Sequence, residues 1–163
     1  MDFIENINPV FFATAILCSA SIFTVVWFLD SLTHGKLVKI DISDKELQTH
    51  RIILATSVLM ELSLVLMFWF NFEMLPFFAA FFITRTVHEF IDELHWHTDR
   101  CSAYESFLHL GMWISVLSKT FLMFMWGFFT QYKGFTDLHL GFYIWGLLVV
   151  GCMGLIGLVE WKR

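Results

Sequence analysis

Four of the seven histidines of this chain lie in one short stretch, between Arg85 and residue 109, and carboxylates are interleaved with them. The residues of this kind are His88, Glu89, Asp92, Glu93, His95, His97, Asp99, Glu105 and His109. Imidazole nitrogens and carboxylate oxygens are the donors that suit Zn²⁺, Fe²⁺ and Mn²⁺ in proteins. The stretch therefore indicates metal binding or proton handling.

Helical spacing sorts these side chains into faces, because residues three, four and seven apart lie on the same side of a helix. One stripe consists of Arg85, His88, Asp92 and His95. A second stripe, about 100° away, consists of Glu89, Glu93 and His97. On the next helix Glu105 and His109 are four residues apart. A short connection makes the two helices antiparallel, so these carboxylates and imidazoles are expected to face one another.

We therefore predict a divalent metal site, with iron or zinc as the ion, in the inner leaflet of a membrane. The predicted ligands are His88, Asp92, His95, Glu105, His109, Glu61 and Glu89. Carboxylate–histidine pairs on two helices, with a glutamate from another, form the layout of di-metal carboxylate bundles. Arg85 and Lys119 lie near mid-span and are assigned to charge balance or a proton path.

Two short runs resemble elements of known families. The sequence Asp92-Glu93-Leu94-His95-Trp96-His97 resembles the acid-acid-x-His-His run of membrane di-iron quinol oxidases, although Trp96 stands where one histidine would be needed. His88-x-x-x-Asp92 resembles a site element of cation-diffusion zinc transporters. Each likeness covers only a few residues and implies metal binding; neither assigns a family.

The composition indicates a membrane protein, because 58% of the 163 residues are hydrophobic and 18% are aromatic, above the usual share in soluble domains. Five segments approach the roughly 20 residues needed to cross a bilayer as a helix. They are residues 9–29, 51–70, 75–97, 104–130 and 138–161. The predicted fold is all-α, a single polytopic membrane domain of about five transmembrane helices, with a soluble loop and a short surface helix at residues 30–50.

Lysine and arginine placement predicts the orientation, since cytoplasmic loops carry an excess of both. With the N-terminus outside and the C-terminus cytoplasmic, the inner segments hold Lys36, Lys39, Lys45, Arg51, Arg100, Lys162 and Arg163. The outer segments then hold only Lys133. The expected location is the plasma membrane or an inner membrane.

Some ionisable residues have a simpler interpretation than metal binding. His97, Asp99 and Arg100 are expected to be solvated at the inner end of the helices. Glu61 has an alternative role as the ion-pair partner of Arg85 or Lys119 at the same depth. His50 is treated as incidental, or as a residue that closes the site from below.

Three functions remain open at this stage. The leading hypothesis is a membrane-bound oxidoreductase acting on a lipid or quinone. The second is an oligomeric channel or transporter for a metal cation or protons, and the third is an accessory subunit of a larger membrane complex. Carboxylates around every histidine argue against haem, and the absence of a basic patch interleaved with aromatic residues argues against nucleic-acid binding. The expected partners are the lipid bilayer and either further copies of the chain or a membrane complex.

Overall fold

The computed structural model describes residues 8–41, 43–97 and 102–162, and of residues 34–41 the backbone alone. The described chain is helical and contains no strand. Its elements are α2 (Pro9–Asp41), α3 (Asp44–Phe70), η1 (Asn71–Met74), α4 (Leu75–Ile91), η2 (Asp92–Trp96), α5 (Ala103–Thr130), η3 (Phe135–Asp137) and α6 (Leu140–Trp161).

Local signals at the helix ends explain where the elements begin and stop. The Ser43 hydroxyl accepts a hydrogen bond from the Glu46 amide and begins α3, satisfying one of the donors that a helix start leaves unpaired. Pro76 lies in the first turn of α4, where its missing amide costs nothing. Gln131 ends α5 in the left-handed conformation, which lets its amide bond back to the last turn.

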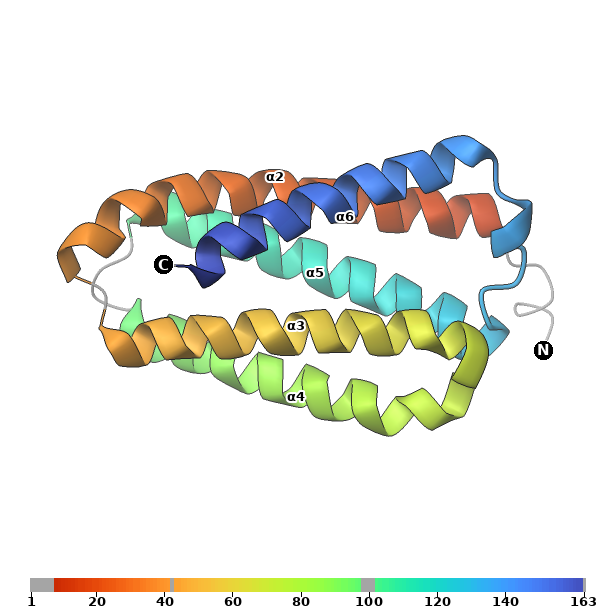
Figure 1. The fold of residues 1–163 in the computed structure, drawn as a ribbon, viewed down its shortest axis with the longest axis horizontal. Helices are drawn as coiled ribbons and strands as arrows, with labels where there is room; N and C mark the ends of the chain where they lie inside the picture. Colours follow the sequence, from red (N-terminus) through yellow and green to blue (C-terminus); the bar gives the residue numbers. More distant parts are fainter. Residues whose placement is uncertain (1–7, 42, 98–101, 163) are drawn as a thin grey trace.

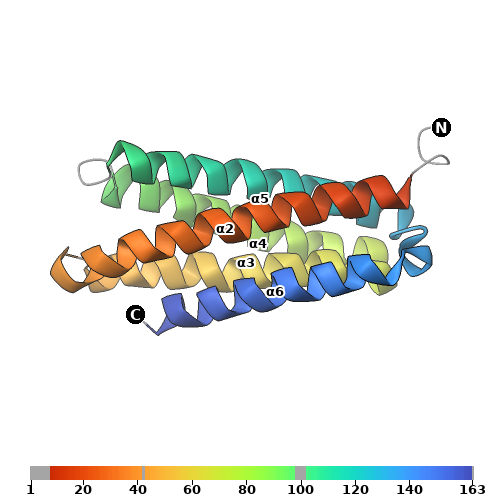
Figure 2. The ribbon, with the colours of Figure 1, turned by 90° about the horizontal axis from the view of Figure 1, so that it is seen from above.

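The long helices run side by side along one axis as a bundle (Figure 1). Helix α2 packs against α5 and α6, and α3 packs against α4, which is reached through the turn at η1 (Figure 2). The end of α2, the start of α3, η2 and the start of α5 therefore lie at one end of the bundle. The turn at η1 and the connection between α5 and α6 lie at the other.

Four helical stretches of the described chain are long and apolar enough to cross a membrane: Pro9–Thr33, Asp44–Trp96, Ala103–Thr130 and Leu140–Trp161. The second stretch is a hairpin, because the chain turns back at η1 and sets α4 beside α3 (Figure 1). Counting both arms of this hairpin gives five membrane-length segments. The prediction of an all-α bundle of about five transmembrane helices is confirmed.

At residues 30–50, where a soluble loop with a short surface helix was expected, the described residues are almost entirely helical. Helix α2 continues to Asp41, and α3 already begins at Asp44. A helix that has formed gains one backbone hydrogen bond for each residue it adds, and no proline lies between residues 30 and 43 to stop it. Two helix ends therefore replace the loop, and both lie at the same end of the bundle (Figure 1).

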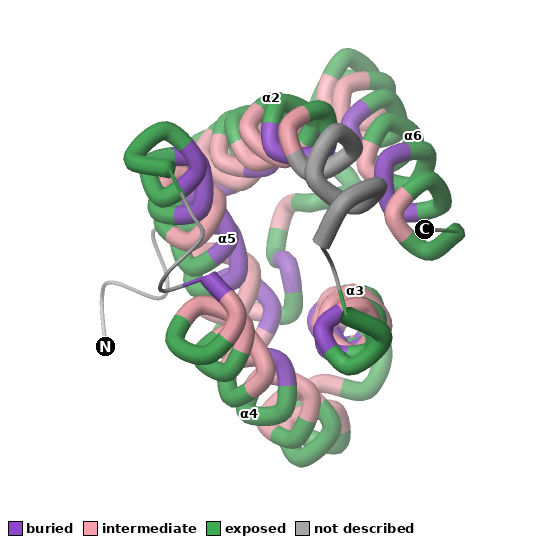
Figure 3. Tube along the Cα trace, turned by 90° about the vertical axis from the view of Figure 1, so that its left-hand side faces the viewer, coloured by how far each residue is buried: buried purple, intermediate pink, exposed green. Residues whose placement is uncertain are grey.

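Polar and apolar residues are distributed as expected for a protein surrounded by lipid. Large apolar side chains such as Phe107, Leu147 and Leu155 are exposed, whereas Arg85 and Lys119 are buried. Buried positions face the middle of the bundle and exposed ones face outward, most completely on α6 (Figure 3). An apolar outer surface of this extent is typical of a face that contacts a membrane.

The apolar core lies at the end of the bundle near η1, where Leu64, Met67 and Trp126 pack together. Tyr132 closes this core, and its hydroxyl donates a hydrogen bond of 2.8 Å to the carbonyl oxygen of Leu64. Burial, and secondarily the charge of Glu61, raises the pKa of the Tyr132 hydroxyl. The residues of the two candidate metal groups lie toward the opposite end.

Candidate metal centre

Four elements bring seven ionisable side chains together at one end of the bundle, and we call this group the histidine cluster. Its members are Asp30 from α2, Glu46 and His50 from α3, Asp92, Glu93 and His97 from η2 and its cap, and His109 from α5. These residues come from parts of the sequence up to 79 positions apart (109 − 30). Only the folded bundle creates the cluster.

A π-helical turn determines which histidine of η2 faces the cluster. The His97 amide donates a hydrogen bond of 3.2 Å to the carbonyl oxygen of Asp92, five residues earlier. This wider turn rotates the following side chains relative to an α-helix. As a result His95 is exposed, while His97 is only 5% exposed.

The His97 ring lies close to the other two histidines of the cluster. The centroid of its ring is 6.1 Å from that of His50 and 4.9 Å from that of His109. His97 therefore has a neighbouring imidazole on α3 and another on α5.

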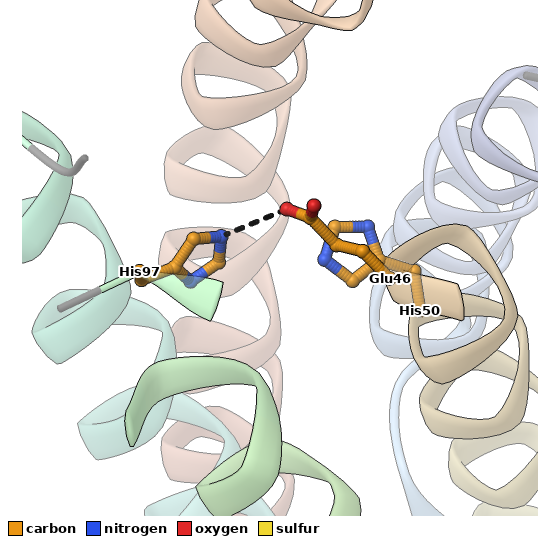
Figure 4. A group of neighbouring side chains, drawn as sticks. All are labelled: Glu46, His50 and His97. Atoms are coloured by element: carbon orange, nitrogen blue, oxygen red, sulfur yellow. Dashed lines mark ion pairs between the residues drawn. The ribbon is translucent and has the colours of Figure 1, made fainter. Parts of the chain in front are cut away.

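Glu46, His50 and His97 form the first group whose ligand atoms lie close enough to hold one metal ion. Glu46 and His50 are one helical turn apart on α3, and the His97 ring points toward the Glu46 carboxylate (Figure 4). His97 Nε2 is 4.0 Å from Glu46 Oε1. His50 Nε2 donates a hydrogen bond of 2.9 Å to Asp92 Oδ1, which fixes the orientation of its ring.

Glu93, His97 and His109 form a second group of this kind. His109 Nδ1 lies 2.9 Å from Glu93 Oε2, and His109 Nε2 lies 3.3 Å from Asp30 Oδ1. His97 Nδ1 is 3.7 Å from the same Glu93 oxygen. His97 thus belongs to both groups.

The donor set of the cluster consists of nitrogen and oxygen atoms. Cys18 and Cys152, on α2 and α6, are exposed and take no part in either group. Imidazole with carboxylate suits Zn²⁺, Fe²⁺ and Mn²⁺ better than metals that require thiolates. Each histidine that binds metal is normally held by a carboxylate on its other nitrogen, and Asp92 and Asp30 stand in that position.

The predicted ligands divide between the cluster and other roles. His109 belongs to the second group, and Asp92 contacts His50 and lies 3.6 Å from His97. His88 is half-buried and lies outside both groups, with its Nδ1 bonded to the carbonyl oxygen of Thr84 at 2.8 Å. His95 is exposed and packs edge-on against Trp96.

Glu105 is buried near the cluster but acts as a helix cap. Its carboxylate accepts a hydrogen bond of 2.7 Å from the Ser102 amide, and the Ser102 hydroxyl accepts one from the Glu105 amide. This reciprocal capping box satisfies two donors at the start of α5. The Glu105 carboxylate, which the sequence analysis predicted to be a metal ligand, is therefore used in this helix cap.

The charges deeper in the bundle form ion pairs. Lys119 Nζ lies 2.7 Å from Glu61 Oε1, as the alternative role of Glu61 predicted. Arg85 pairs with Glu89 one turn away and donates a hydrogen bond of 2.9 Å from Nε to Ser57 Oγ. The charge-balance role of Arg85 and Lys119 matches this geometry, and Glu61 and Glu89 lie outside both metal groups.

Sequence reasoning missed several residues of the cluster. The expectation that His97 is solvated is wrong, because the π-turn directs it inward; Asp99 and Arg100 lie outside the described residues. Asp30 and Glu46 were not proposed, because they lie in the segment expected to be soluble, whereas His50 was named only as a residue that could close the site from below. The i, i+4 spacing of Glu46 and His50 was visible in the sequence and is the signal that would have pointed to them.

Comparisons of the chain with protein-family models, curated proteins and solved structures found no match. The structure of the chain is therefore the only basis for assigning its class. The chain is a helical bundle with membrane-length apolar helices and with buried histidine–carboxylate groups suited to a metal ion.

Proposed function

We propose that the chain is a metal-dependent membrane enzyme whose metal ion is bound by Glu46, His50 and His97. The observation that carries this proposal is the convergence of these three side chains, from α3 and from the residue that caps η2, with Glu46 and His97 buried and His50 half-buried. Two histidines and one carboxylate leave coordination positions open for water or substrate. Catalytic zinc sites and non-haem iron(II) oxygenases both use this ligand set.

Asp92 supports the catalytic interpretation. Its hydrogen bond to His50 Nε2 holds the ring in place, so Nδ1 would be the nitrogen available to bind a metal ion. Such carboxylate–histidine–metal arrangements raise the basicity of the ligand. A bound ion would supply Lewis-acid or redox chemistry, and these residues would hold it with an open side.

The surroundings of the cluster favour a lipid-soluble substrate. Phe90 and Leu94 are exposed beside Glu93, and Phe107 and Leu110 are exposed on either side of His109. Because the helix surface beside the cluster is apolar, the cluster would lie within reach of acyl chains or a quinone. Within the proposal, iron would make the protein an oxidoreductase and zinc would make it a hydrolase; we favour the oxidoreductase.

The ion pairs deeper in the bundle favour transport as a second candidate. Lys119–Glu61 and Arg85–Glu89 continue the ionisable residues from the cluster toward the middle of the helices. Chains of such residues inside membranes mark ion and proton pathways. Flux of Zn²⁺ or protons into liposomes, abolished by Glu61→Gln, would favour this function over the enzyme.

Metal analysis of the purified protein tests the proposal. The full-length chain is purified in detergent from cells supplied with iron and zinc, and its metal content is measured by mass spectrometry. We expect at least about one ion per chain, a content lower by about one ion in His50→Ala, and no bound ion in His97→Ala, because each variant removes a ligand. His95→Ala is the matched control, since His95 is exposed on the same turn and should keep the metal.

A protein free of metal after loading would overturn the proposal. Equal metal content in His97→Ala and His95→Ala would remove the first group from the site. Iron content together with oxygen consumption on addition of a quinol or an unsaturated lipid tests the oxidoreductase. Zinc without oxygen consumption would contradict it.

A further inference from the structure

We infer that the histidine cluster binds two metal ions and that His97 bridges them, with one ring nitrogen on each ion. The inference rests on the proposed function for the first ion, at Glu46, His50 and His97. It adds a second ion at Glu93, His97 and His109.

The two nitrogens of the His97 ring face the two groups separately. Nε2 is directed toward Glu46 Oε1, at 4.0 Å. Nδ1 is directed toward Glu93 Oε2, at 3.7 Å, and toward Asp92 Oδ2, at 3.6 Å. A single imidazole in this position offers a lone pair to each side once both ring protons are gone.

These separations suit ligands of a shared cation. Hydrogen bonds involving a ring nitrogen and a carboxylate are usually 2.7–3.2 Å long, roughly half an ångström or more below the His97 distances. Two ligands of one tetrahedral zinc ion lie about 3.4 Å apart, from metal–ligand bonds of about 2.1 Å. A small closure of the side chains would therefore complete each site.

The two outer histidines are held in the same way. His50 Nε2 contacts Asp92 at 2.9 Å, and His109 Nε2 contacts Asp30 at 3.3 Å. In both cases a carboxylate contacts Nε2, so Nδ1 would be the metal-binding nitrogen; His109 Nδ1 lies 2.9 Å from Glu93, the carboxylate proposed to share its ion. The cluster thus repeats one arrangement on either side of His97.

The charges of the cluster come within one unit of balancing two divalent ions. The carboxylates of Asp30, Glu46, Asp92 and Glu93 carry four negative charges when ionised, and a His97 imidazolate adds a fifth, so two dications leave one net negative charge. On binding the second ion, the neutral His97 ring releases its remaining N–H proton to solvent and becomes an imidazolate. Any proton shared between His109 Nδ1 and Glu93 is also released, because metal ligands must be deprotonated.

Copper titration of the full-length protein tests the inference, with Cu²⁺ as a spectroscopic probe for the divalent ion. We expect about two Cu²⁺ per chain in the wild type, about one in His109→Ala and in His50→Ala, and no tightly bound ion in His97→Ala. His88→Ala, outside both groups, is the matched control and should retain about two. His109→Gln provides a second variant if His109→Ala does not fold.

Electron paramagnetic resonance then tests the bridge. The first equivalent of Cu²⁺ should give an isolated copper signal, and the second should weaken it, because an imidazolate couples the two electron spins. Two ions without coupling would overturn the bridge. One ion in both the wild type and His109→Ala would overturn the second site and leave the proposed function standing, whereas no ion at all would overturn both.

Discussion

Two polar regions lie inside this bundle, and they handle buried charge differently. In the middle of the bundle, each cation has a carboxylate beside it: Lys119 pairs with Glu61, and Arg85 with Glu89. In the histidine cluster, the described contacts of the carboxylates are with imidazoles, which carry a charge only when protonated.

The difference teaches what each region is suited to do. A pair of a cation and a carboxylate is complete without a ligand. The Lys119–Glu61 pair joins α5 to α3, and the Arg85–Glu89 pair neutralises two charges within α4. An imidazole can exchange its proton for a metal ion, and its carboxylate partner can then orient it. The cluster is therefore the region built for chemistry, and variants of the two regions should affect different measurements.

The largest effect on stability is expected from Lys119→Met. Removing one partner of a buried ion pair leaves Glu61 unbalanced and should cost about 3–5 kcal/mol, measured by unfolding in detergent. Metal content should stay at the wild-type value. The double variant Lys119→Met/Glu61→Leu should recover most of the loss, and failure to recover it would show that the pair is more than a structural contact.

Asp92→Asn should affect the metal instead. The amide is a poorer partner for the His50 Nε2–H than the carboxylate, so metal affinity should fall about 10- to 100-fold, measured by competition with a chelator. Glu73→Gln, an exposed carboxylate at the far end of the bundle, is the control and should bind as the wild type. An unchanged affinity in Asp92→Asn would contradict its orienting role.

Lowering the pH should weaken metal binding by the histidine cluster. Metal binding requires ring nitrogens without protons, so lowering the pH makes protons compete with the metal and weakens binding by about tenfold per unit for each proton displaced. Zinc retained after dialysis between pH 8 and pH 5 measures this loss. Retention that does not change with pH would contradict histidine ligation.

The smallest effect is expected from Glu105→Gln. Glutamine can replace glutamate in a capping box, so stability should change by less than about 1 kcal/mol, and metal content should stay the same. Ser102→Ala should destabilise α5 by about 1 kcal/mol with the same unchanged metal content. A large loss of metal in Glu105→Gln would contradict the capping role alone and would support Glu105 as the metal ligand that the sequence analysis predicted.

Much of the fold followed from the sequence because apolar length decides which segments can cross a membrane. Helices α3 to α6 end within a few residues of the predicted segments, except where α3 begins earlier. The extension of α2 to Asp41 was missed because its final part lacks the apolar signal on which the prediction relied.

The two candidate metal groups draw on the stretch between residues 85 and 109 and also on Glu46 and His50 of α3, and this membership could not be read from helical spacing. The α-helical period groups Asp92 with His95, whereas the π-turn of η2 exposes His95 and buries His97. A π-turn has no sequence signal that spacing reveals. Contacts with Asp30 and Glu46 depend on packing between distant helices, which no local pattern contains.

Anomalous scattering from crystals of the metal-loaded protein, recorded at the absorption edge of the bound metal, tests the central claim most directly. The account predicts a peak between Glu46, His50 and His97, with nitrogen and oxygen atoms at about 2.0–2.2 Å. A peak at His88 or His95 with none at His97, or no peak after loading, would contradict it.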